Sequence, residues 1–289
     1  MAATIRNPIE WCADQLRHLA DGFGATGRAL GHVPETMHSP LPAVRRIGVA
    51  DLKYALARGF DDFGACRTDV VFLCAFYPIV GIVLGRFIFG TGMLPLLFPL
   101  AGGFALIGPL AAVGLIEISR RREQGAPVNW ATAFDVLRSP SIGAIALLGF
   151  LLMAIFLLWL FAADTIYRFT LGPAEPESLA GFAHDVFTTA PGWALIGIGI
   201  GVGFLFALLV LVISVVSFAL LLDREAGLDT AIRTSVRVVA ANPATMALWG
   251  LIIAAGLVLG SLPLFLGLVV VMPTLGHATW HLYRRVVGT

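Results

Sequence analysis

The feature that most constrains this chain is a series of long apolar runs that follow one another almost to its end. A helix of about 20 predominantly apolar residues can cross the hydrocarbon core of a bilayer. Six such runs can be drawn, at residues 70–89, 94–118, 142–163, 193–222, 244–262 and 263–283. With 58% hydrophobic and 13% charged residues, a soluble fold would expose more apolar surface than water tolerates. The sequence predicts an all-α polytopic membrane protein with six transmembrane helices.

Consecutive runs pair into three hairpins, at residues 70–118, 142–222 and 244–283, and the first and third hairpins share a pattern. The segment Gly-Ile-Val-Leu-Gly at 81–85 matches Gly-Leu-Val-Leu-Gly at 256–260. The prolines of the two return spans match as well, and they are Pro99 and Pro109, then Pro263 and Pro273. An even number of spans separates the copies, so a parallel internal repeat about an axis along the membrane normal is expected. The middle hairpin is expected to be a divergent copy.

These four prolines are candidate helix breakers. A proline inside a helix removes a backbone hydrogen bond and kinks the chain. In transporters, broken helices hold a solute at the interface between repeats. Prolines also occur in spans where they only shape packing, and both interpretations stay open.

The distribution of basic residues predicts the orientation. All but two of the 19 Lys and Arg residues lie before the first run, between the second and third, between the fourth and fifth, or after the sixth. Short basic segments stay on the cytoplasmic side, so both termini are expected there, in a bacterial inner membrane. The net charge of +1 gives no reason to expect a nucleic-acid partner. A basic inner face suits membrane lipids with anionic headgroups.

Amphipathic segments precede several runs. Residues 1–47 are expected to form a cytoplasmic N-terminal region with a helix beginning after Asn7, and residues 48–289 the six-helix transmembrane domain. Apolar residues recur at helical spacing again at 49–63, 129–137 and 229–239. These segments are expected to lie on the inner leaflet, and docking of a partner is the alternative.

Few ionisable side chains fall within the apolar runs, where burying a charge is costly. Arg86 is expected to snorkel from the outer end of the first run, and Glu117 to pair with an arginine one turn later. His277 and His281 lie one turn apart in the last run. Hydrogen bonding within the core is the expected role of this pair, and metal binding or proton relay is the alternative.

The motifs of enzyme chemistry are missing from the sequence. It contains no HExxH, GxSxG, P-loop or CxxC pattern, and its three cysteines, Cys12, Cys66 and Cys74, do not have metal-ligand spacing. We therefore expect no catalytic residue, no metal, no cofactor and no enzymatic activity.

Three parts of the chain carry a family resemblance. They are LPLLFPLAGGFALIGPLAAVGLIEISRRR at residues 94–122, the pairs Asn242-Pro243 and Trp249-Gly250, and GHATWHLYRR at residues 276–285. Together they resemble the bacterial family of predicted integral membrane proteins catalogued as domain of unknown function 2189. The resemblance extends roughly from Gly48 to Val286, and it transfers no activity, catalytic residue or cofactor.

Some members of that family carry a cytochrome c oxidase label, which the sequence can test. A haem-copper catalytic subunit needs several histidines at membrane depth on different helices. Of the six histidines here, only His277 and His281 fall within an apolar run. The catalytic role is thereby excluded, and an accessory role beside such a complex stays open.

Two functions remain. The first is a non-catalytic accessory, assembly or scaffold subunit of a membrane complex, for example a respiratory complex. A partner protein would then dock on glycine-rich helix faces. The alternative is a transporter or channel for a small or lipid-like solute. A transporter requires a hydrated cavity between the proline helices, whereas a subunit requires a filled core and an apolar flank.

Overall fold

The computed structural model describes residues 41–66, 79, 86, 94–174, 176, 178–224, 226–263 and 266–287. The described residues form helices and no strand, and one isolated bridge pairs Val44 with Val287. The first apolar run and the helix expected after Asn7 lie outside the described residues, apart from residues 79 and 86. The all-helical fold is as predicted.

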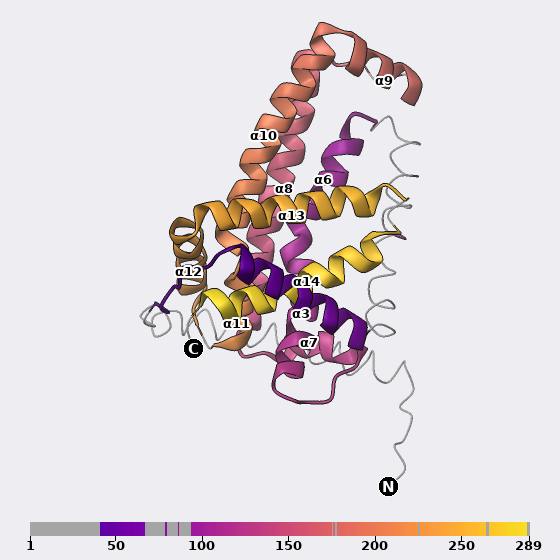
Figure 1. The fold of residues 1–289 in the computed structure, drawn as a ribbon. Coiled ribbons are helices and arrows are strands. Elements are labelled where there is room, and N and C mark those ends of the chain that lie inside the picture. The colour runs from indigo at the N-terminus through magenta and orange to yellow at the C-terminus, as the bar shows by residue number, and fades with distance from the viewer. Residues whose placement is uncertain are drawn as a thin grey trace.

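One group of helices stands side by side. It contains α6 (Leu97–Ala111), α8 (Ile142–Thr170) and α10 (Ala190–Ser214), with α11 (Ser217–Asp223) continuing from α10 (Figure 1). The short helix α9 (Leu179–Thr188) joins α8 to α10 at one end of the molecule. Helix α10 begins where Thr189 accepts a hydrogen bond from the Gly192 N–H at 3.1 Å, with Pro191 in the first turn, which is a standard helix start.

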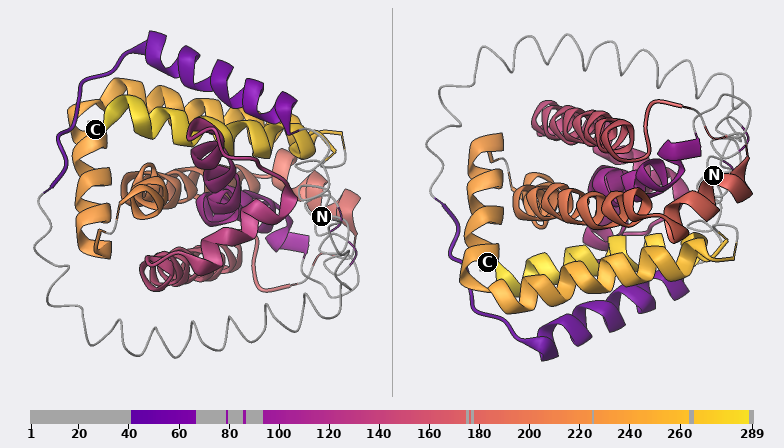
Figure 2. Two further views of the ribbon diagram at one scale, coloured as in Figure 1. Left: turned by 90° about the horizontal axis from the view of Figure 1, so that it is seen from below. Right: turned by 90° about the horizontal axis from the view of Figure 1, so that it is seen from above.

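A second group runs across the first. Helices α13 (Pro243–Ser261), α14 (Leu268–Val286) and α3 (Val49–Ala65) lie crosswise to α8 and α10 in Figure 1, and Figure 2 shows them alongside one another. Helix α12 (Leu228–Ala241) connects the two groups. The large buried side chains Phe218, Trp249 and Trp280 belong to the common core.

Helices α3 and α14 pack closely because of a glycine. A Cβ atom at Gly59 would lie 2.6 Å from the backbone nitrogen of Ala278 and 2.6 Å from the carbonyl oxygen of Thr274. Only a residue without a side chain fits there. The buried face of α3 includes Leu52, Ala55 and Phe63, so this part of the amphipathic helix covers protein.

Two other expected amphipathic segments, at residues 129–137 and 229–239, are also helical. Residues 129–137 coincide with the 3₁₀ helix η2 (Trp130–Arg138), which Asn129 caps by accepting from the Ala131 N–H at 2.9 Å. Residues 229–239 lie within α12. That these helices lie on the membrane surface stays a prediction.

Among the described residues, three helices are long and apolar enough to span a membrane: Ile142–Thr170, Ala190–Asp223 and Pro243–Ser261. The six-span, three-hairpin architecture and the internal repeat are not confirmed. The run at 94–118 is divided into a 3₁₀ turn, η1 (Leu94–Leu96), then α6 and α7 (Val113–Glu123), which are separated at Ala112. Pro109, which lacks a backbone N–H, precedes this break by three residues. The last run becomes α14, which is outside the three candidate spans.

Candidate functional site

A cluster of buried polar side chains lies where α3, α7 and α14 meet. It contains Asp62, Ser119, His277 and His281, all buried. The Ser119 hydroxyl donates to Oδ2 of Asp62 at 2.6 Å and lies 2.8 Å from Nδ1 of His277. A hydroxyl carries one hydrogen, so Nδ1 of His277 must be the donor to Ser119. We call these four residues the buried cluster.

Asp62 is the centre of the buried cluster. Its Oδ2 also accepts from Nε2 of His281 at 2.8 Å, and its Oδ1 forms an ion pair with Nη1 of Arg122. Burial raises the pKa of Asp62, but the hydrogen bonds from His281 and Ser119 outweigh it and hold the pKa below its ordinary value. Asp62 lies on α3, outside the candidate spans, and is ionised at neutral pH.

His277 has one ring nitrogen inside the network and one outside it. Its Nε2 makes no hydrogen bond within the described part of the chain. With Nδ1 protonated and the imidazole neutral, Nε2 is a buried acceptor. The described residues contain no group of three or more His, Cys, Asp or Glu side chains placed to hold a metal ion. His281 binds Asp62 directly, and His277 is linked to Asp62 through Ser119. The two histidines therefore belong to one hydrogen-bond network that joins α3, α7 and α14.

Glu117 forms a second buried site on α7. Arg120 donates to it from Nε and Nη2, both at 2.7 Å, and Nε of Arg121 donates to Oε1 at 2.7 Å. The ion pair expected from the spacing along the helix is formed, and it involves both arginines. The Glu117 side chain is 2% exposed, and the two arginines neutralise its charge. It is therefore not available to bind a solute.

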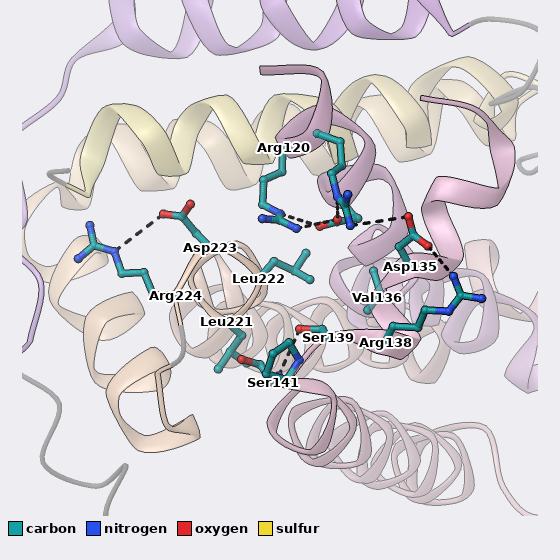
Figure 3. Close-up of a pocket in the computed structure, with 13 residues that line it drawn as sticks. Arg120, Asp135, Val136, Arg138, Ser139, Ser141, Leu221, Leu222, Asp223 and Arg224 are labelled. Atoms are coloured by element: carbon teal, nitrogen blue, oxygen red, sulfur yellow. Dashed lines mark hydrogen bonds and ion pairs between the residues drawn. The ribbon is translucent and has the colours of Figure 1, made fainter. Parts of the chain in front are cut away.

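Arg120 and Arg121 of α7 face a pocket of about 550 Å³, which we call the arginine pocket (Figure 3). Its walls come from α7, η2, the start of α8 and the end of α11. Four arginines line it, Arg120, Arg121, Arg138 and Arg224, together with three carboxylates, Glu117, Asp135 and Asp223. The pocket therefore has one positive charge in excess.

A second cavity, of about 500 Å³, lies between α6, α10, α11, α13 and α14, and we call it the apolar cavity. Pro109 and Met272, the residue before Pro273, contribute to its wall. Its hydroxyl groups belong to Ser214 and Thr279, which donate to carbonyl oxygens of their own helices, those of Val210 and Leu275, at 2.6 and 2.8 Å. The lining that remains is apolar, which suits hydrocarbon better than water.

The remaining predicted site residues are spread over the molecule. Arg86 is exposed. Pro99 is buried in the first turn of α6, where its carbonyl oxygen accepts from the indole N–H of Trp159 at 3.0 Å. Pro109 and Pro273 lie inside α6 and α14, and Pro263 is exposed in the turn after α13. The structure therefore does not gather the four prolines at one site.

Sequence reasoning missed Asp62, Ser119 and Arg122. One signal was available for Asp62: it lies seven residues after Ala55, on the face of α3 that also carries Gly59. A carboxylate on the apolar face of an amphipathic helix indicates a buried partner. Ser119 offered no such signal, because its partners come from helices distant in the sequence.

Comparison with known proteins identifies the central part of the chain. Residues 97–223 match the family model described as predicted integral membrane protein (DUF2189). This is the family that the sequence resembles, and the DUF2189 match runs from the start of α6 to the end of α11. With the three candidate spans, it makes this chain a predicted integral membrane protein. No curated protein and no solved structure matches the chain.

Proposed function

We propose that this protein is a non-catalytic accessory, assembly or scaffold subunit of a membrane complex, for example a respiratory complex, in a bacterial inner membrane. In this proposal the chain has six spans, both termini are cytoplasmic, and neither a metal nor a cofactor is bound. The engagement of Asp62, Glu117 and His281 in internal pairs supports a structural role for the ionisable groups.

One observation carries the proposal: no part of the described chain covers Gly197 and Gly201 on α10. A Cβ atom placed at Gly197 or Gly201 would meet no atom of the described chain within 4 Å. Gly197 and Gly201 have the i,i+4 spacing that lets two helices approach closely in a membrane. Large apolar side chains flank them, for example Ile198 and Ile200, which are 50% and 58% exposed. This face favours a helix from a neighbouring membrane protein.

The test is native mass spectrometry of the protein extracted at its endogenous level into lipid nanodiscs. We expect a stoichiometric protein partner that is retained by wild type and lost from the Gly197→Ile/Gly201→Ile variant. Gly102→Ile is the matched control, since Gly102 is an exposed glycine of α6 whose Cβ would also meet nothing. A partner that survives the double substitution, or no partner in wild type, contradicts the proposal.

A second candidate function is binding or transport of a lipid-like solute, and the apolar cavity favours it. Ala254 and its neighbour Ala255 on α13 are both exposed, but only Ala254 lines the cavity. If the cavity holds hydrocarbon, Ala254→Phe removes a copurified lipid from the native mass spectrum and Ala255→Phe does not. Equal lipid retention in both variants contradicts this function without affecting the scaffold proposal.

A further inference from the structure

The arginine pocket has donors that its own carboxylates do not use fully. Nη1 of Arg138 lies 3.6 Å from Oδ1 of Asp135, and Nη2 of Arg121 lies 3.8 Å from Oδ2 of the same residue. Both distances are longer than a hydrogen bond. Asp135 therefore lies near both guanidinium groups without a hydrogen bond to either at these atoms, and the N–H groups that Glu117 does not use stay available to an oxyanion.

The buried carboxylate behind these arginines fixes the α7 side of the pocket. Glu117 accepts three hydrogen bonds from Arg120 and Arg121. Its oxygens are thus directed at guanidinium groups, and its burial keeps it from repelling an anion at the pocket mouth. Arg121 is 40% exposed and Arg138 57% exposed at the side chain, so both reach the open part of the pocket.

The start of α8 adds a further attraction for negative charge. Ser139 and Ser141, the N-cap residue of α8, line the pocket, and Ser139 accepts from the N–H groups of Ser141 and Ile142 at 3.2 and 3.0 Å. The attraction from this helix start comes from the helix dipole, which is positive there. A helix start combined with arginine side chains is the usual composition of a phosphate site.

The pocket also lies at the ends of two candidate spans, α8 and the α10–α11 helix, with Val136, Leu221 and Leu222 in its wall (Figure 3). If these two helices cross the bilayer, a group bound there lies at the level where a lipid headgroup meets the hydrocarbon region. We propose that the arginine pocket binds a phosphate-bearing group, which goes beyond the scaffold function and does not depend on it. A phospholipid headgroup and free phosphate share this chemistry.

The experiment uses the full-length protein in nanodiscs of zwitterionic phosphatidylcholine, with either a minor fraction of anionic phosphatidylglycerol or added inorganic phosphate. Native mass spectrometry counts retained phosphatidylglycerol, and thermal unfolding reports stabilisation by either ligand. Arg138→Gln is expected to weaken binding about fivefold, since one arginine near an anionic lipid contributes roughly 1 kcal/mol. Asp135→Asn is expected to strengthen binding, because it removes a competing negative charge.

Arg168→Gln is the matched control, because Arg168 is an exposed, ion-paired arginine at the opposite end of α8. Dependence on Arg138 with phosphatidylglycerol alone identifies a lipid headgroup as the ligand. The same dependence with inorganic phosphate identifies a free phosphate site. If Arg138→Gln and Arg168→Gln behave alike with both ligands, or Asp135→Asn weakens binding, the proposal is overturned.

Discussion

Asp61 and Asp62 are adjacent in the sequence and occupy opposite environments on α3. The Asp62 side chain is 4% exposed and bound to Arg122, His281 and Ser119. The Asp61 side chain is 62% exposed, and its Oδ2 lies 3.9 Å from Nη1 of Arg58, which is longer than a hydrogen bond. Removing one partner of a buried ion pair costs about 3 kcal/mol or more, whereas an exposed pair contributes less than about 1 kcal/mol. Asp62→Asn should therefore lower the midpoint of thermal unfolding in detergent clearly more than Asp61→Asn, and equal shifts would contradict the buried cluster.

The same carboxylate predicts a pH dependence. Because the pKa of Asp62 is lower in the folded protein than the ordinary value, the ionised group stabilises the fold above about pH 4, and this contribution is lost as the pH falls further. His277, His281 and Arg122 face the group, and each of them favours its ionised form when positively charged. The stability difference between wild type and Asp62→Asn should be present at pH 5 to 7 and shrink below about pH 4. A difference that grows on acidification would refute this.

The sequence could point to part of this cluster. The i,i+4 spacing of His277 and His281 in an apolar run identified the two histidines as a pair, and the spacing of Glu117 identified its arginines. The place of Asp62 on the apolar face of α3 could indicate that it is the buried one of the two adjacent aspartates, but no local pattern identifies its partners on α7 and α14. The hydrogen bond from Ser119 to Asp62 joins residues 57 positions apart, beyond the range of periodicity arguments.

At the scale of helices, the contact between α3 and α14 depends on the absence of a side chain at Gly59. Gly59→Ala would place a Cβ 2.6 Å from two backbone atoms of α14, so the helices must separate, and overpacking of this kind costs roughly 1–3 kcal/mol. Gly64 lies on the same helix with nothing within 4 Å. Gly64→Ala should be neutral or stabilise by up to about 1 kcal/mol, because alanine favours helix. The midpoints of thermal unfolding of the two variants test this prediction. An unfolding midpoint for Gly59→Ala equal to that of wild type would contradict the close contact between α3 and α14.

Helix existence was predictable from the apolar and amphipathic patterns, and helix continuity was not. The amphipathic pattern at 49–63 corresponds to α3, and the run at 142–163 lies within α8. The run at 94–118 has the composition of one span, but it is divided at Ala112. Apolar composition indicates that residues are shielded from water. It does not indicate whether their helix is straight or broken, or whether it crosses its neighbours, as α13 crosses α8 and α10 in Figure 1.

For the whole molecule, the arrangement of charge gives a prediction of orientation. Four arginines, Arg120, Arg121, Arg138 and Arg224, lie at one end of α8 and of the α10–α11 helix, since all of them line one pocket. Helix α9 lies at the opposite end of the pair (Figure 1). If these two helices cross the bilayer, a residue near α9 and a residue after α7 must face opposite aqueous compartments, and the basic end is expected to face the cytoplasm.

Cysteine labelling in whole cells tests this orientation, with the native cysteines replaced by serine. A membrane-impermeant maleimide added outside the inner membrane should label Ser178→Cys, an exposed position before α9. It should label Gln124→Cys, an exposed position after α7, only when the membrane is permeabilised. Labelling of both positions from one side would mean that neither helix crosses the bilayer. The reverse pattern would retain the spans and place the arginine pocket on the outer face, where a lipid of the outer leaflet would be its ligand.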